Sequence, residues 1–149
     1  MKAVLIPGDG IGREIAQSVR AVSEALDTGI VWQEFAAGAE YAAVEGELLQ
    51  PGLLDAIEEC GWALKGPTAT PIGKGFRSIN VQLRQRFSTY ANLRPVHTLP
   101  GVKSRYDNVD LVIVRENTED LYKGIEYKLN DDIANGVKLI TRPACDKIC

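Results

Sequence analysis

The start of the chain constrains the fold most, because a strand, a glycine-rich turn and a helix follow one another directly. The apolar run Ala3–Ile6 predicts a short buried strand, and the turn Pro7–Gly12 comes next. From Ile15 to Leu26, apolar residues recur at helical spacing. A strand that passes through a tight turn into a helix is typical of α/β proteins, so we predict an α/β fold.

The residues that follow continue this alternation. The predicted elements are strands at Ile30–Phe35 and Trp62–Leu64 and helices at Gly38–Val44 and around Leu53–Ile57. The segment Gly66–Gly75 is rich in Pro, Gly and Thr, which predicts a loop. After it, Ser78 is suited to cap a helix that runs to about Phe87.

The pattern of apolar and polar residues changes towards the end of the sequence. Leu111–Val114 is a continuous apolar run, and Gly124–Leu129 and Val137–Thr141 alternate like two paired strands with a polar connection. We therefore predict a second structural unit. Residues 1–92 would belong to a large α/β domain, and residues 93–149 would begin a smaller domain.

The composition is that of an ordinary soluble globular chain, since 45% of its 149 residues are hydrophobic and 25% are charged. No apolar run approaches the roughly 20 residues that span a bilayer, and the immediate start of the first strand argues against a signal peptide. The three cysteines, Cys60, Cys145 and Cys149, form no CxxC pair, which favours a reduced setting without disulfides. We therefore expect a cytoplasmic protein without a membrane partner.

The basic residues are unevenly distributed along the chain. Between Glu59 and Asp107 there is no acidic residue, yet eight of the 17 basic residues fall there, so the nine others face all 20 acidic residues. This asymmetry indicates a local anion site. Nucleic acid is disfavoured because the pI is about 5.2 and few aromatic residues are available for stacking. A solvated basic face is the plainer alternative, but the interleaved Gly, Ser, Thr and Asn residues favour a small anionic ligand.

Polar residues of this segment fall where they could meet around such a ligand. Asn80 and Arg84 are four apart and so project from one face of the predicted helix, with Ser78 at the N-terminus that attracts anions. Arg94 ends an extended segment and Arg115 ends the apolar strand. Guanidinium forks pair bidentately with carboxylates, so this set would suit a compact polycarboxylate. Separate structural ion pairs are the alternative.

The turn Gly8–Gly12 permits two interpretations. It stands where a Rossmann phosphate loop would stand, and Glu34 follows at the distance expected for a ribose-binding acid. However, its spacing is GxGxG rather than GxGxxG, and Asp9 would place a negative charge against a pyrophosphate. A tight structural turn is therefore favoured.

Four longer stretches carry a resemblance. They are IPGDGIG at Ile6–Gly12, LKGPTATPIGKGFRSINVQLRQRF at Leu64–Phe87, YANLRPV at Tyr90–Val96 and VDLVIVRENTEDLYKGIEY at Val109–Tyr127. Together they resemble the β-decarboxylating dehydrogenases, which act on isocitrate, 3-isopropylmalate or homoisocitrate. The Ser78-x-Asn80 pair and the RENTEDLY run are most similar to isocitrate dehydrogenase. The resemblance implies an α/β fold with two domains around a cleft, which is not a Rossmann fold.

The resemblance also implies residue roles. Ser78 and Asn80 would contact the isocitrate carboxylate that distinguishes this tricarboxylate substrate. The carboxylate clamp would consist of Arg84, Arg94 and Arg115. Tyr122 would protonate the enol or enolate after CO2 leaves, and Thr70 would lie beside the nicotinamide. The implied reaction is oxidative decarboxylation of isocitrate to 2-oxoglutarate with NAD, or alternatively NADP, and with Mg2+ or Mn2+.

Members of this family are much longer than the present chain, which resembles their N-terminal portion. Their metal-binding aspartates lie in the C-terminal half, so no metal ligand is predicted among the residues present. We expect a homo-oligomer or a pairing with the missing C-terminal half. The run GVKSRYDNVDLV and the short N-terminus favour NAD over NADP. The alternative function is a catalytically silent fragment or non-catalytic subunit that retains an anion-binding surface.

Overall fold

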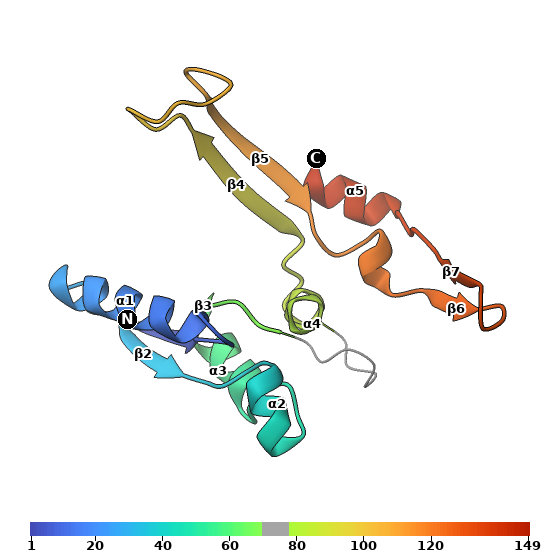
Figure 1. The fold of residues 1–149 in the computed structure, drawn as a ribbon, viewed down its shortest axis with the longest axis horizontal. Helices are drawn as coiled ribbons and strands as arrows, with labels where there is room; N and C mark the ends of the chain where they lie inside the picture. Colours follow the sequence, from blue (N-terminus) through green and yellow to red (C-terminus); the bar gives the residue numbers. More distant parts are fainter. Residues whose placement is uncertain (70–77) are drawn as a thin grey trace. The chain divides into compact units, whose positions relative to one another are not determined.

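The computed structural model describes residues 1–69 and 78–149 and divides the chain into two compact units, Met1–Ile79 and Asn80–Cys149 (Figure 1). The predicted boundary between residues 92 and 93 concerns the domains of a complete enzyme and stays a prediction. Among the helices of the described ranges, none combines the length and the apolar character that crossing a bilayer requires.

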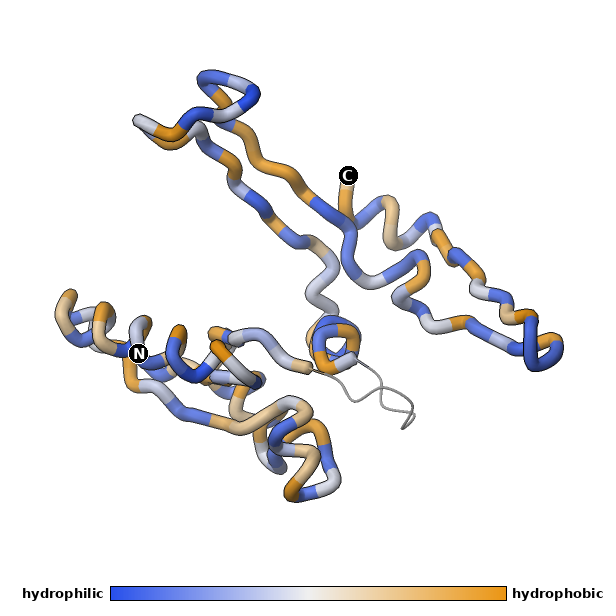
Figure 2. The backbone as a smooth tube through the Cα atoms, viewed as in Figure 1, coloured by the Kyte–Doolittle hydropathy of each residue, from blue (hydrophilic) through white to orange (hydrophobic). Residues whose placement is uncertain are grey.

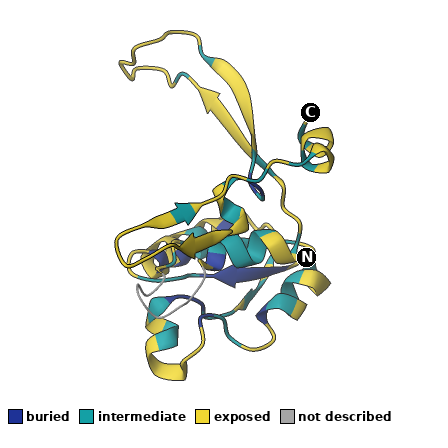
Figure 3. Cartoon of the chain, turned by 90° about the vertical axis from the view of Figure 1, so that its right-hand side faces the viewer, coloured by how far each residue is buried: buried dark blue, intermediate teal, exposed yellow. Residues whose placement is uncertain are grey.

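Three parallel strands form the sheet of the first unit, in the order β2-β1-β3. The central strand β1 (Lys2–Ile6) pairs on one side with β2 (Val31–Glu34) and on the other with β3 (Ala63–Lys65). The predicted apolar run Ala3–Ile6 is at most 1% exposed, and Figure 3 shows β1 as a buried strand. A strand covered on both faces needs such a continuous apolar run.

Helices connect these strands, as expected for an α/β unit. α1 (Gly12–Ala25) joins β1 to β2, whereas α2 (Ala39–Glu45) and α3 (Leu53–Cys60) lie between β2 and β3. Helix α3 contacts β1 and buries Leu53 completely. The predicted alternation of strands and helices is therefore confirmed in this unit.

The turn after β1 is closed by the side chain of Asp9. Its carboxylate accepts hydrogen bonds from the backbone N–H groups of Ala39 at 3.1 Å, Glu40 at 2.9 Å and Ala69 at 2.6 Å. The backbone N–H of Asp9 donates to the carbonyl of Pro67 at 2.8 Å. The turn is thereby joined to the start of α2 and to the loop after β3. The backbone N–H groups at this turn thus donate to a carboxylate of the protein itself. This favours the interpretation as a tight structural turn.

Glycine is required in this turn because two segments of backbone approach closely. At Gly8 the φ angle is +77°, and a Cβ atom would lie 1.9 Å from the carbonyl oxygen of Pro67. The acid that a Rossmann site would use for ribose, Glu34, is paired instead with Arg20 of α1. Both observations agree with a turn that serves packing.

The second unit is built around an antiparallel strand pair. β4 (Ala91–His97) pairs with β5 (Asp110–Glu116), from Ala91↔Glu116 to His97↔Asp110. The other elements are α4 (Ile79–Arg86), the 3-10 helix η1 (Leu121–Lys123), β6 (Glu126–Lys128), β7 (Ala134–Gly136) and α5 (Arg142–Ile148). Helix α4 begins directly after Ser78, at the predicted position.

One strand of this unit differs from its prediction. The partner of β6 is Ala134–Gly136 and not Val137–Thr141, because the backbone N–H of Leu129 donates to the carbonyl of Ile133 and closes a shorter turn. Of the alternating residues after Gly136, the backbone N–H of Val137 donates to the carbonyl of Ile125 at 2.9 Å, whereas Leu139 forms an isolated bridge with Asp120.

The apolar residues of β5 are exposed to solvent in this unit. Leu111–Val114 are 45% to 57% exposed. Figure 2 shows β5 as a hydrophobic strand, and Figure 3 shows β4 and β5 as mainly exposed. An apolar strand of this kind is expected to associate with further protein surface. The three cysteines of the chain are free thiols.

Candidate active site

Tyr122 contacts two arginines of the predicted cluster. It belongs to η1, and the guanidinium carbon atoms of Arg84 and Arg115 lie 5.6 and 5.9 Å from the centroid of its ring. A nitrogen of the Arg115 guanidinium donates a hydrogen bond of 2.8 Å to the Tyr122 hydroxyl oxygen. Because that oxygen accepts this bond, its own hydrogen is left to be donated to another group. The phenol therefore lies beside two arginines with its own hydrogen free for a further acceptor.

Strand pairing places Arg94 on the same face of the strand pair as Arg115. Asn92 of β4 stands directly opposite Arg115 of β5, and Arg94 lies two residues further along β4. Directly opposed residues share a face, as do residues two apart on one strand. The Nε–H of Arg94 donates a long hydrogen bond of 3.4 Å to the side-chain oxygen of Asn92. Both arginines are exposed, so their charges are accessible to a ligand.

Helix α4 contributes Asn80 and Arg84 from one face, four residues apart. Both are half-buried, whereas Ser78, directly before the helix, is exposed. The structure thus brings Arg84, Arg115 and Tyr122 into contact, and it places Asn80 one turn from Arg84. The role of Ser78 and Asn80 towards a substrate stays a prediction. Thr70 lies outside the described residues.

Gln85 holds Tyr122 through the backbone, a contact that the sequence analysis missed. Its side-chain N–H donates to the carbonyl of Tyr122 at 3.2 Å. Two consecutive residues of α4, Arg84 and Gln85, therefore hold the same tyrosine at the ring and at the main chain. Only the position of Gln85 beside an arginine of the predicted cluster could have indicated this role.

The carboxylate of Glu116, at the end of β5, organises the following turn. It accepts hydrogen bonds from the hydroxyl and the backbone N–H of Thr118 and from the backbone N–H of Glu119. Burial acts to raise the pKa of Glu116, but the hydrogen bonds from Thr118, Glu119 and the backbone of Asn117 outweigh it and lower the pKa below its ordinary value of 4.5. This carboxylate is therefore ionised and structural at neutral pH.

Glu119 ties the same turn to the start of α5. Only 7% exposed, it accepts hydrogen bonds from the backbone N–H of Thr141 at 2.7 Å and from the Thr141 hydroxyl at 2.8 Å. The ammonium of Lys123, four residues along the chain, lies 3.9 Å away. Together with Glu116, this residue fixes the backbone that carries Tyr122.

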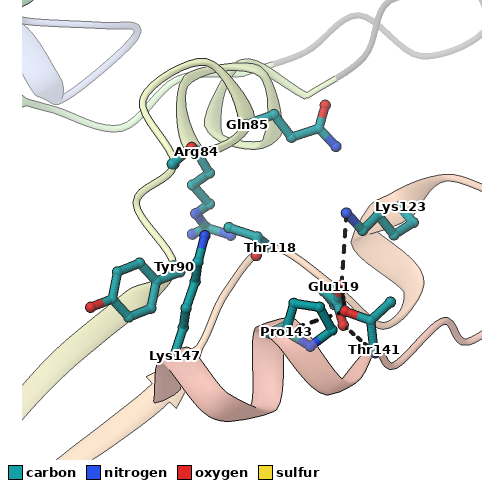
Figure 4. A pocket seen from close by; sticks show the side chains of 11 residues that line it. Arg84, Gln85, Tyr90, Thr118, Glu119, Lys123, Thr141, Pro143 and Lys147 are labelled. Carbon is teal, nitrogen blue, oxygen red and sulfur yellow. Dashed lines mark hydrogen bonds and ion pairs between the residues drawn. The ribbon is translucent and has the colours of Figure 1, made fainter.

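A pocket of about 430 Å³ adjoins this region within the second unit (Figure 4). Its wall combines basic and hydroxyl-bearing side chains from α4, η1 and α5 with the buried carboxylate. The lining residues are Arg84, Gln85, Ser88, Tyr90, Thr118, Glu119, Lys123, Thr141, Pro143, Ala144 and Lys147. Such a polar wall suits an anionic group better than an apolar ligand.

The residues described here do not offer a metal site. Within ranges 1–69 and 78–149, no group of three or more His, Cys, Asp or Glu side chains gathers in a way that could hold a metal ion. Asp110 is paired with His97 at 2.9 Å, and Asp120 lies 3.8 Å from Lys138. A divalent ion would therefore need ligands beyond this part of the chain.

The fold and the site define a class of protein, namely an α/β protein in which two arginines contact one tyrosine. More specifically, the chain belongs to the isocitrate/isopropylmalate dehydrogenase family, whose sequence model matches residues 2–149. A crystal structure of isocitrate dehydrogenase from Methylococcus capsulatus is similar, with a TM-score of 0.90 and 40% identity over 99% of this chain and 44% of that chain. The predicted family and its α/β fold are confirmed.

Curated relatives include more than one activity. The chain is 46% identical to the isocitrate dehydrogenase [NAD] catalytic subunit 6, mitochondrial, of Arabidopsis thaliana, covering 99% of this chain and 40% of that protein. It is 44% identical to the chloroplastic 3-isopropylmalate dehydrogenase of Solanum tuberosum, covering 97% and 40%. It is also 42% identical to a mitochondrial regulatory subunit of isocitrate dehydrogenase [NAD] from Dictyostelium discoideum, covering 99% and 40%. The chain thus spans about 40% of the length of these relatives.

The prediction of a cytoplasmic location is wrong. The isocitrate dehydrogenase relatives from Arabidopsis, Drosophila and yeast are mitochondrial by name, which points away from the cytoplasm. The prediction rested on cysteines without a disulfide pattern, and such cysteines indicate a reducing environment rather than one particular compartment.

Proposed function

We propose that this chain provides the substrate-binding arginines and the acid catalyst of an NAD-dependent isocitrate dehydrogenase. The observation that carries the proposal is the Tyr122 hydroxyl, which accepts a hydrogen bond from Arg115 while its ring lies against Arg84. Similarity to the NAD-linked Arabidopsis enzyme supports the substrate and the cofactor. Since the chain spans about 40% of that relative, the reaction belongs to a complete enzyme.

In this proposal the arginines bind and orient the substrate. Arg84, Arg94 and Arg115 pair with the carboxylates of isocitrate, because guanidinium groups match planar carboxylates and keep their charge at any physiological pH. Ser78 and Asn80 contact the carboxylate that isopropylmalate lacks. These polar residues favour isocitrate over the substrate of the potato relative.

Tyr122 acts after decarboxylation. When the carboxyl group leaves as CO2, the electron pair of the broken C–C bond forms an enolate, and the Tyr122 hydroxyl transfers its proton to the carbon that lost CO2. Arg115 then stabilises the resulting phenolate through the hydrogen bond already present. In the complete enzyme, NAD+ supplies the hydride acceptor for the preceding oxidation, and Thr70 is proposed to lie beside it.

The test replaces Tyr122 by Phe in a complete enzyme that contains this segment. Turnover with isocitrate, NAD+ and Mg2+ should fall at least about a hundredfold, because the proton donor is lost, whereas isocitrate affinity should change little. The control is Tyr127→Phe, which removes a hydroxyl from a tyrosine that is 53% exposed in β6. Loss of isocitrate binding with unchanged turnover of bound substrate would contradict the role of Tyr122 as the acid.

A non-catalytic subunit is the second candidate, favoured by the 42% identity to a regulatory subunit from Dictyostelium. Such a protein would bind isocitrate through the same arginines without turning it over. Calorimetric binding with no turnover, in the presence of the remaining subunits, would support this candidate.

The relatives are named as subunits, so we also propose that the chain assembles, either with copies of itself or with the remainder of an enzyme. The exposed apolar residues of β5 support this proposal. A compact monomer in size-exclusion chromatography at high concentration would argue against it.

A further inference from the structure

Two cationic side chains in the pocket point toward one another. In Figure 4, the guanidinium of Arg84, from α4, and the ammonium of Lys147, from α5, converge beside Thr118. Like charges at close range repel, and water weakens this repulsion at the exposed Lys147. Such convergence is favourable when an anion lies between the two groups.

The charges of the pocket wall leave these two cations without an acidic partner. The basic residues of the wall are Arg84, Lys123 and Lys147, and Glu119 is the acid among the described lining residues. Glu119 is buried, accepts two hydrogen bonds from Thr141 and lies 3.9 Å from Lys123. In the part of the chain that the structure describes, neither Arg84 nor Lys147 forms a salt bridge.

Two hydroxyl groups of the wall are already used as donors. The Thr118 hydroxyl donates to Glu116, and the Thr141 hydroxyl donates to Glu119. The charged nitrogen atoms of the wall remain as donors for a ligand, together with its other hydroxyl groups. Charged N–H donors select an oxyanion, and a volume of about 430 Å³ leaves room for a group of phosphate size.

We propose that Arg84 and Lys147 form an oxyanion site that takes a phosphate or carboxylate group. The site goes beyond the proposed isocitrate clamp, because Lys147 lies on α5 and outside the set of clamp residues. It shares Arg84 with the clamp, and Arg84 also lies over the ring of Tyr122. An anion bound here therefore contacts a side chain that contacts the candidate acid.

The test is a titration of the full chain with inorganic phosphate, followed by the amide signals of Thr118, Thr141 and Lys147 in NMR spectra at constant ionic strength. Lys147→Gln should weaken phosphate binding about tenfold, the size expected for losing one charge-assisted hydrogen bond at an accessible position. Lys147→Arg, which keeps the charge, should bind within a few-fold of the unchanged chain. Lys128→Gln, a matched loss of charge on exposed strand β6, should have no effect.

A parallel titration with acetate identifies the ligand class. If phosphate binds much more tightly than acetate, the natural ligand of the site carries a phosphate group. If the two bind equally, the ligand carries a carboxylate. The proposal is overturned if phosphate leaves the three amide signals unchanged, or if Lys147→Gln binds as tightly as the unchanged chain while its spectrum shows an intact fold. Neither result depends on isocitrate or on turnover, so failure here leaves the proposed dehydrogenase function untouched.

Discussion

Replacing Asp9 by Asn tests whether one carboxylate organises the first unit. One oxygen, Oδ2, accepts the N–H groups of Ala39 and Ala69, and Oδ1 accepts the N–H of Glu40. Asparagine has the same shape but a single acceptor oxygen. Its NH2 group would have to face a backbone N–H at the second position, where a hydrogen bond cannot form.

The cost follows from these three hydrogen bonds. If the asparagine oxygen takes the position of Oδ2, the bonds from Ala39 and Ala69 become neutral ones and the bond from Glu40 is lost. Bonds to charged groups contribute about 1.5–3 kcal/mol and neutral ones about 0.5–1.5 kcal/mol. Because Asp9 is only half-buried, we expect the variant to lose about 2–4 kcal/mol of stability.

Urea unfolding is the assay, because Trp32 and Trp62 form an edge-to-face pair in this unit, with ring centroids 5.6 Å apart, and report its unfolding by fluorescence. Hydrogen exchange should accelerate at the three amides that Asp9 now binds. The control is Asp27→Asn, the same chemical change at an exposed residue outside these contacts. An Asp9→Asn variant with unchanged unfolding midpoint and unchanged amide protection would refute the reasoning.

Three further predictions concern the second unit. Gln85→Leu removes the donor to the Tyr122 carbonyl and should cost about 0.5–1.5 kcal/mol of stability while shifting the NMR signals of the Tyr122 ring; unchanged ring signals would count against a positioning role. Because hydrogen bonds lower the pKa of folded Glu116, its contribution to stability is present above pH 4.5 and is lost as the pH falls through the lower folded pKa. Glu116→Gln should therefore flatten the dependence of unfolding free energy on pH below 4.5, and an equally steep dependence would contradict this. Arg94→Lys keeps the charge but not the planar fork, so isocitrate affinity measured by calorimetry should fall at least about tenfold, and wild-type affinity would remove Arg94 from the clamp.

Much of the fold could be predicted from local sequence. The central strand, its helix and the strands on either side followed from the period of apolar residues, since that period reflects which face of an element is buried. Arg84 and Arg115 were named from residue type and spacing, and Tyr122 from the family resemblance. The structure brings the three into contact, and their roles stay predictions.

The second strand of the β6–β7 hairpin could not be predicted correctly. Alternation marks a strand but does not say which strand will pair with it. Residues 137–141 alternate, yet Leu139 bridges to Asp120 and the hairpin pairs one segment earlier. The segment that pairs with β6 is decided by the turn that closes the hairpin and by backbone groups distant in the sequence.

The sequence by itself therefore determined the α/β order of elements and the family, because both depend on residue type and local spacing, and it supplied the arginines that we propose to bind the substrate. Tertiary structure alone decided what the polar side chains bind. Asp9 finds its partners 30, 31 and 60 residues away, and the Gln85 side chain reaches the carbonyl of a residue 37 positions along the chain. A hydrogen bond needs its donor and acceptor about 3 Å apart, and only the folded backbone brings such distant groups that close.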